Sequence, residues 1–327
     1  MIKNILKGLF LAFLIIATFF ILNKHSNNSN DTFQQNTGRI FGTNYKFVYS
    51  AKKNYASELH DVLNQVDASL SMFNKESRLY RINQGETDTT DAYIKEVLEL
   101  SQWVSKETDG AFDCTVAPIV NAWGFGFKNK EVITDEVIDS LKQLVGYQKI
   151  QLTADGRLVK ADPRIMLDFG AIAKGYGVDV VATYLQNQGV KNFLVEIGGE
   201  IVTKGQNAEG KPWKIGIQDP DSESYSKIIE VTDKAMATSG NYRNYYVTES
   251  GQFVAHTIDP HTAQPVQHSL LSATVFAPTC AMADAFATAF MVMGVDKAKT
   301  MLAAHNNLSA YFIYQENDSI KTWMSRK

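Results

Sequence analysis

The order of strand-like and helix-like segments is the feature that most constrains the fold of this chain. Apolar runs typical of strands come in groups, and segments with an apolar residue every three or four positions separate those groups. A doubly wound fold would instead alternate one strand with one helix. The order therefore predicts an α+β fold with mixed, partly antiparallel sheets and packed helices.

Apolar spacing and capping residues locate the expected elements. Aliphatic side chains from Leu59 to Leu70 fall on one face of the first helix, and Asp91 is available as the N-cap of the second. We expect helices over residues 59–70, 94–104, 134–144, 171–188, 279–294 and 295–305. We expect strands over residues 40–51, 149–152, 165–167, 191–197, 213–217, 227–231, 253–258, 272–277 and 309–314.

The N-terminus has the pattern of an export signal. Lys3 and Lys7 precede an uncharged apolar run over residues 9–22, and a tract rich in Ser and Asn follows. The run is shorter than the roughly 20 residues of a comfortable transmembrane helix, which favours a cleaved signal peptide. The lack of an A-x-A-like site favours an uncleaved anchor, which we prefer. The lysines then stay in the cytoplasm and the chain from about residue 24 lies outside.

These patterns divide the chain into three parts. Residues 1–23 are the signal or anchor, residues 24–37 a polar linker, and residues 38–327 one folded domain. Lys and Arg total 32 against 35 Asp and Glu, so no basic surplus is present and nucleic acid is not an expected partner.

Two cysteines limit the covalent and metal chemistry. Cys114 and Cys280 lie far apart and form no C-x-x-C pair, which excludes a zinc ribbon, a cysteine-ligated iron–sulfur cluster and a disulfide scaffold. Cys114 is also too far from the apolar run for a bacterial lipoprotein. We expect both cysteines to be buried free thiols.

The stretch LDFGAIAKGYGVD carries the strongest chemical signal. A strand ending in Asp168 runs through Gly170 into a helix that bears Lys174. Free amides, the positive end of the helix dipole and a lysine in the first turn suit a phosphate group. The alternative is a small-residue helix start packed on a sheet. The spacing is neither that of a Walker A loop nor that of a G-x-G-x-x-G motif.

Three further segments have both a functional and a structural interpretation. Asp284 and Thr288 are four apart on one helix face, where they could ligate Mg²⁺ or simply face solvent among core alanines. His256 could act as base, acid or ligand, or be satisfied by Asp259 in the following turn. The glycine-spaced aromatic residues that follow Phe112 suit an aromatic ligand or a core.

Together these segments resemble, in sequence order, the motifs of the ApbE family, the FAD:protein FMN transferases. The matching stretches are GAFDCTVAPIVNAWGFG, LDFGAIAKGYGVD, LVEIGGEI, ATSGNY, HTIDPHTAQP and ADAFATAFMVMG, and the resemblance extends from about Arg39 to the C-terminus. It implies an ApbE-like, T-fold-like architecture. It also implies Mg²⁺-dependent transfer of the FMN half of FAD, as substrate, to a Thr or Ser hydroxyl of an acceptor protein, with release of AMP.

The resemblance also implies roles for individual residues. The Mg²⁺ ligands correspond to the carbonyl of Ala171 and the side chains of Asp284 and Thr288. We expect Asp284 and His256 to be the catalytic residues, with His256 as the candidate base because the unperturbed pKa of histidine lies near the working pH. The residues that correspond to the family's FAD contacts are Phe41, Phe73, Ala111, Phe112, Asp113, Asp168, Lys174 and His256. Phe41 and Phe73 replace the methionine and tyrosine that are usual in the family.

Partners and location follow from the same resemblance. Family acceptors carry D-x-x-[ST]-G-A-T-like segments in membrane subunits of flavin electron-transport complexes. The N-terminal segment would place this enzyme on the bacterial inner membrane with its catalytic domain on the periplasmic side. Two alternatives remain: an FAD pyrophosphatase giving FMN and AMP, and a non-catalytic exported flavin-binding protein, which could dispense with Asp284 and Thr288.

Overall fold

The computed structural model describes residues 32–126, 133–220, 224–241, 245–247 and 253–325. The expected anchor over residues 1–23 lies outside this part. No helix among the described residues is both long and apolar enough to cross a membrane. β1 (Phe33–Ile40) begins at Phe33, within the range expected for the linker.

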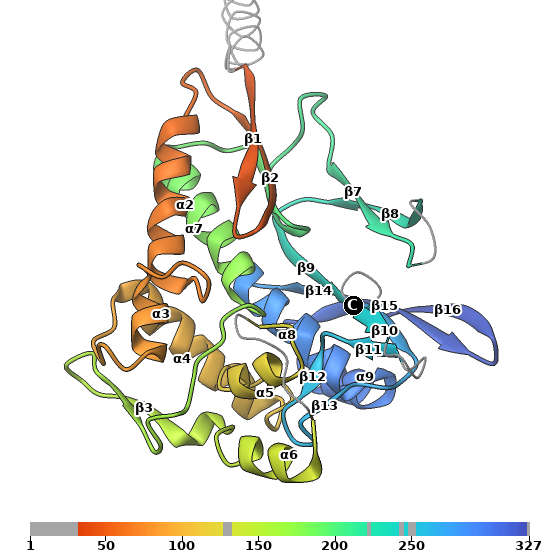
Figure 1. Cartoon of the computed structure of the whole chain (residues 1–327). Coiled ribbons are helices and arrows are strands. Elements are labelled where there is room, and N and C mark those ends of the chain that lie inside the picture. The colour runs from red at the N-terminus through yellow and green to blue at the C-terminus, as the bar shows by residue number, and fades with distance from the viewer. Residues whose placement is uncertain (1–31, 127–132, 221–223, 242–244, 248–252, 326–327) are drawn as a thin grey trace, which may run out of the picture.

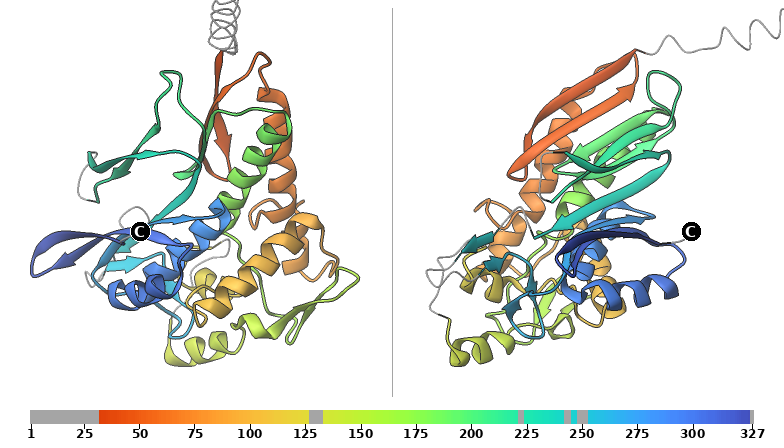
Figure 2. Two further views of the ribbon diagram at one scale, coloured as in Figure 1. Left: turned by 180° about the vertical axis from the view of Figure 1, so that it is seen from behind. Right: turned by 90° about the vertical axis from the view of Figure 1, so that its right-hand side faces the viewer.

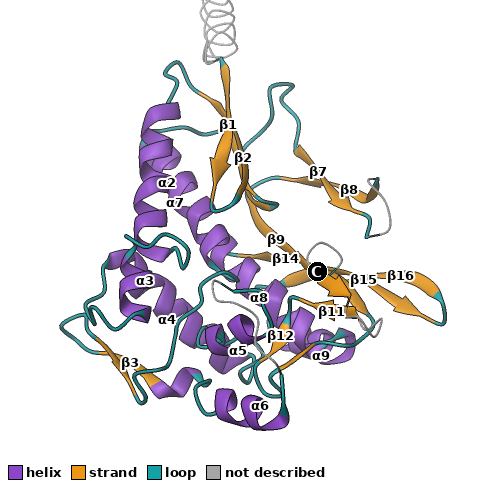
Figure 3. Ribbon diagram, in the orientation of Figure 1, coloured by secondary structure: helices purple, strands orange, loops and turns teal. Residues whose placement is uncertain are grey.

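One eight-stranded sheet forms the centre of the molecule. Figure 3 shows the strands in orange. Every neighbouring pair in this sheet is antiparallel. Its strands, in spatial order, are β1, β2 (Thr43–Ser50), β5 (Phe193–Ile197), β6 (Glu200–Lys204), β9 (Lys234–Gly240), β14 (Leu270–Ala277), β15 (Ser309–Glu316) and β16 (Ser319–Met324). The α+β class expected from the sequence is confirmed.

The two faces of this sheet are covered by different elements. Along β5, Val195 and Ile197 pack in the cluster that includes helix residues, whereas Leu194 packs with Trp213 and Ile215 of a separate hairpin. That hairpin is β7 (Trp213–Gln218) with β8 (Tyr225–Val231). Because successive side chains of a strand point to opposite faces, this alternation gives β5 one helical and one β-hairpin neighbour.

Three helices cover the helical face of the sheet. They are α2 (Ala56–Leu70), α7 (Ala173–Asn187) and α8 (Cys280–Met293), and α2 and α7 run side by side (Figure 1). The buried face of α8 is rich in alanine, which lets it lie close to β9 and β14. On its other side α8 contacts α4 (Ala92–Glu107) and α9 (Val295–Ala304). These contacts bury most of α8, whereas Thr288 keeps partial exposure.

Shorter elements complete the helical half of the molecule (Figure 2). They are α3 (Arg78–Asn83), α5 (Ala117–Ala122), α6 (Asp135–Lys142), the 3-10 helix Tyr147–Lys149, and the hairpins β3 (Ile150–Leu152) with β4 (Leu158–Lys160), β10 (Tyr245–Val247) with β11 (Phe253–Ala255), and β12 (Ile258–Asp259) with β13 (Gln264–Pro265).

Several expected element boundaries were wrong. The strand expected over residues 40–51 is the second arm of a hairpin that turns at Phe41 and Gly42, both with positive φ. Residues 165–167 belong to no strand. The side-chain amide of Asn83 bonds both backbone groups of Leu167 in place of a neighbouring strand. Helix α7 begins at Ala173 rather than at residue 171, and β11 ends at Ala255, just before His256.

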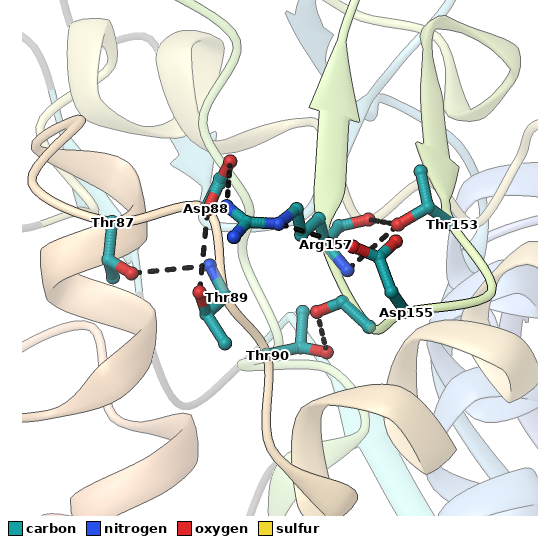
Figure 4. A network of polar contacts seen from close by, with 8 residues as sticks. Thr87, Asp88, Thr89, Thr90, Thr153, Asp155 and Arg157 are labelled. Carbon is teal, nitrogen blue, oxygen red and sulfur yellow. Dashed lines mark hydrogen bonds and ion pairs between the residues drawn. The ribbon is translucent and has the colours of Figure 1, made fainter.

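An exposed polar network fixes the β3–β4 hairpin to the rest of the helical half (Figure 4). The guanidinium of Arg157 bonds both carboxylate oxygens of Asp88, at 2.8 and 3.1 Å, and lies 3.3 Å from Asp155. The hydroxyl of Thr90 donates to the carbonyl of Gly156. These contacts join the loop before α4 to the hairpin across a stretch of surface.

Candidate active site

The glycine junction before α7 is held in place from two sides. Asn83 pairs with Leu167, and the amide of Asp168 donates to the carbonyl of Cys114 at 2.7 Å. The carboxylate of Asp168 accepts the amide of Gly170 at 2.6 Å, which forms the turn into the helix. Burial raises the pKa of Asp168, although the Gly170 amide and Lys174 oppose the rise. The segments that contain Cys114 and Asp168 are distant in sequence, and this backbone bond holds them side by side at the glycine junction.

Gly175 brings α7 and α8 into direct contact. A Cβ at this position would lie 2.4 Å from the backbone oxygen of Cys280, so only glycine permits this helix separation. The Gly175 amide donates to Asp284 Oδ2 at 3.1 Å. In a regular α-helix that amide would donate to the carbonyl of Ala171. The carbonyl of Ala171 thus lacks its usual helical donor, because that amide is bonded to the buried carboxylate of Asp284.

A buried cluster of charges lies at the same point. The Lys174 ammonium is 3.6 Å from Asp284 Oδ2 and 3.3 Å from Glu200 Oε1. Both carboxylate side chains are 3% exposed, whereas the Lys174 side chain is 29% exposed and therefore accessible to a ligand. Burial would lower the pKa of Lys174, but the attraction of Asp284 and Glu200 outweighs it and raises that pKa. Burial raises the pKa of Glu200, and Lys174 limits the rise.

Thr288 and His256 are tied to the end of β9. The hydroxyls of Thr288 and Ser239 are 3.2 Å apart. Two residues further on, buried Asn241 accepts the hydroxyl of Thr257 at 2.6 Å. His256, next to Thr257, presents its ring to Phe125 at 6.3 Å between centroids. The end of β9 thus contacts both the helix that bears Thr288 and the segment that contains His256.

Two phenylalanines predicted from the family pattern lie near the glycine junction. Phe41 has φ of 51°, unusual for a bulky residue, and its ring occupies the space beside Gly177 on α7. Phe73 is 66% exposed. Its neighbour Met72 lies within 4.0 Å of the position where a Cβ of Gly170 would be. The Phe41 ring thus packs against α7, and the turn that carries Phe73 approaches Gly170 through Met72.

The side chains of the GAFD segment are buried or bonded within the protein. Phe112 is 2% exposed and lies in the main core cluster, and Ala111 is buried as well. The Asp113 carboxylate accepts the amide and hydroxyl of Thr115 and the amide of Tyr147. Burial raises the pKa of Asp113 against the effect of these bonds. We conclude that Asp113 shapes this loop, and that ligand contacts at Phe112 would come from its backbone.

Sequence reasoning missed the roles of Asn83 and Glu200. No local pattern marks Asn83, since its bonds to Leu167 cross 84 positions. Glu200 lies in the LVEIGGEI motif, directly after two glycines. A carboxylate at that position is the local signal that could have identified it as a candidate site residue. Both cysteines are buried and free, as predicted. Among the described residues, no group of three His, Cys, Asp or Glu side chains could hold a metal ion.

Comparison with known proteins identifies the family of this chain. The family model described as the ApbE family matches residues 41–312. The chain belongs to the ApbE family. The FAD:protein FMN transferase of Vibrio cholerae is 38% identical over 307 residues, covering 88% of this chain and 90% of that protein. The protein of the same name from Haemophilus influenzae is 38% identical over 305 residues, with 88% of each covered.

A solved structure of a family member shows the same fold. The flavin transferase ApbE from Vibrio cholerae superposes with a TM-score of 0.82 at 35% identity, covering 90% of this chain and 97% of that one. The family membership expected from the sequence motifs is therefore confirmed. This ApbE family member is an enzyme, a transferase.

Proposed function

We propose that this chain transfers the FMN half of FAD to a Thr or Ser hydroxyl of an acceptor protein and releases AMP. Relatives named FAD:protein FMN transferase support the flavin substrate. The observation that carries the site assignment is the 3.1 Å bond from the Gly175 amide to Asp284, which leaves the Ala171 carbonyl without its helical donor. A flavin carrier would need no such arrangement.

The oxygens at this point suit Mg²⁺. Asp284 supplies one buried carboxylate, Thr288 a hydroxyl one turn later, and Ala171 a carbonyl released from the helix. Hard oxygen ligands in small number, with places left for water and phosphate oxygens, are what Mg²⁺ takes in nucleotide enzymes. When bound, Mg²⁺ would neutralise charge on the pyrophosphate of FAD.

The chain's own groups would bind and orient the rest of the substrate. The accessible Lys174 ammonium suits the pyrophosphate. The free amides expected at the start of α7 are mostly occupied, because the amides of Gly170, Ile172, Ala173, Gly175 and Tyr176 already donate within the chain. Phe41 and Phe73 offer apolar surface at the junction, and Asp168 can accept a hydrogen bond from a ribose or adenine donor better than it can face a phosphate. His256 is the proposed proton acceptor for the attacking hydroxyl, because the unperturbed pKa of histidine lies near neutral pH.

We also propose the setting in which this occurs. The apolar segment over residues 9–22 would anchor the enzyme, with its catalytic domain on the periplasmic side of a bacterial inner membrane. Acceptors with a D-x-x-[ST]-G-A-T-like segment in membrane subunits would then be within reach. Retention of full-length protein in washed membranes would support the anchor, and recovery of a shortened soluble form would contradict it.

Asp284→Ala tests the proposed chemistry. The full-length protein is incubated with FAD, Mg²⁺ and a peptide containing the acceptor segment, and the peptide's gain of the mass of FMN is measured. The variant should lose transfer by about 10³-fold, since it loses the buried carboxylate that would hold Mg²⁺. Near-normal transfer by folded Asp284→Ala would contradict the metal assignment. Release of free FMN and AMP by the native enzyme, with unlabelled peptide, would favour the pyrophosphatase.

His256→Ala separates proton transfer from binding. If His256 is the base, single-turnover transfer at saturating FAD should slow by about 10²–10⁴-fold while FAD affinity, followed by flavin fluorescence, changes little. If His256 only holds the cofactor, affinity should fall and the rate at saturation should recover. The second result would remove His256 from the catalytic residues.

A further inference from the structure

Glu200 is a buried carboxylate that the proposed chemistry does not use. It begins β6, directly after the turn at Gly198 and Gly199, and its side chain is 3% exposed. Oε1 lies 3.3 Å from the Lys174 ammonium, whereas Oε2 is buried and has no hydrogen-bond partner in the described chain. A carboxylate in this setting is costly to bury, so its position calls for an explanation.

Among the described residues, Lys174 forms ion pairs with two carboxylates, Asp284 and Glu200, and these two differ in their other contacts. Asp284 Oδ2, at 3.6 Å, also accepts the Gly175 amide and is the carboxylate proposed to hold Mg²⁺. Glu200 is not one of the proposed Mg²⁺ ligands, and its Oε1 lies 3.3 Å from the same ammonium. With Asp284 as its only partner, the ammonium would compete directly with a divalent cation for the same oxygen.

We propose that Glu200 is a positioning residue that keeps the Lys174 ammonium off Asp284, so that Asp284 can take a divalent cation while Lys174 stays charged and available to phosphate. This inference rests on the proposed function, because it assigns Mg²⁺ to Asp284. The fold supports it: β6 presents Glu200 to the helical face of the sheet, whereas Ile201 packs on the opposite face. The two glycines before it allow the turn that brings Glu200 against α7.

The test measures binding of Mg²⁺ alone, by titration calorimetry on the metal-free full-length chain without FAD. Glu200→Gln should weaken Mg²⁺ binding by about tenfold, the size of coupling between close buried charges. Lys174→Met should bind Mg²⁺ at least as tightly as the native chain, because the competing ammonium is gone. In the double variant, Glu200→Gln should then add less than about a twofold loss.

A matched control comes from the same hairpin. Glu196 lies on β5 and alternates with Val195 and Ile197, so it faces away from α7. Glu196→Gln removes one negative charge nearby and should leave Mg²⁺ binding and transfer unchanged. If Glu200→Gln does not fold, as judged by thermal unfolding, Glu200→Asp replaces it. Its shorter reach should give the same direction of change at smaller size.

The outcomes separate this inference from the proposed function. If Asp284→Asn keeps native Mg²⁺ affinity, the metal site itself is wrong. If Asp284→Asn abolishes binding but Glu200→Gln binds like the native chain, Glu200 has no such role. An undiminished tenfold loss in the Lys174→Met background would show that Glu200 acts on the cation directly, which also overturns the inference.

Discussion

Two clusters of ion pairs in this protein differ in opposite ways: the exposed one has the shorter distances, and the other is buried. In the exposed network of Figure 4, Arg157 bonds Asp88 at 2.8 Å, and the two side chains are 55% and 52% exposed. In the buried cluster, Lys174 lies farther from its partners, at 3.3 Å from Glu200 and 3.6 Å from Asp284. Distance alone would make the exposed pair the stronger one.

Physical chemistry predicts the opposite order. Water around Arg157 and Asp88 screens their attraction, and ordering two long side chains offsets much of the gain. At Glu200 and Asp284 water is excluded, so removing the one cation leaves two buried carboxylates uncompensated. The exposed network therefore fixes a hairpin, whereas the buried cluster joins α7, α8 and β6 through charges shielded from water.

Lys174→Met should show the largest effect on stability. The change leaves Asp284 and Glu200 without their cation, and we expect the free energy of unfolding to fall by about 3 kcal/mol. Urea unfolding at pH 7 measures it. A loss as small as that of an exposed pair would show that the two clusters do not differ in the way described.

Asp179→Asn should change the pH dependence of stability. Asp179 caps α8 through the amides of Cys280 and Ala281, and burial raises the pKa of its carboxyl to about 6. Since the pKa is lower in the unfolded chain, this group favours the folded state below about pH 4, and that contribution is lost as pH rises through 6. Urea unfolding from pH 4 to 7 should therefore show a smaller decline in Asp179→Asn than in the native chain. An unchanged slope would contradict the raised pKa.

Gly175→Ala should damage the buried cluster without changing a charge. Its Cβ would meet the backbone of Cys280, which cannot move away as a side chain could, so we expect a loss of about 2 kcal/mol together with lost transfer. Gly177→Ala is the control. There the Cβ would meet the ring of Phe41, a side chain that can move, rather than the backbone of α8. Equal losses at the two positions would show that the separation of α7 and α8 is not the sensitive feature.

Arg157→Ala should have the smallest effect. It removes the exposed bonds to Asp88 and Asp155, and the melting temperature should fall by at most about 2 °C at low salt, with no difference at 0.5 M NaCl. Transfer activity should be unchanged. A larger, salt-independent loss would place this network alongside the buried cluster.

Local signals correctly predicted much of the fold. Asp91 caps α4, and Thr134 caps α6 where that helix was expected to begin. Helical spacing correctly marked α2, α8 and α9, because amphipathic periodicity reflects only which face is buried. The strand expected over residues 165–167 was wrong, since an apolar run cannot reveal that Asn83, rather than a second strand, satisfies its backbone.

The sequence by itself determined the order of the elements, their caps and the motifs that indicate the ApbE family. The tertiary structure alone decided which charges meet. Lys174 and Glu200 are brought together by a sheet and a helix, and the Gly175 amide reaches Asp284 across 109 positions. Such contacts depend on how closely two elements pack, and local patterns carry no information on that distance. The buried cluster is for that reason a property of the fold, whereas its separate residues are properties of the sequence.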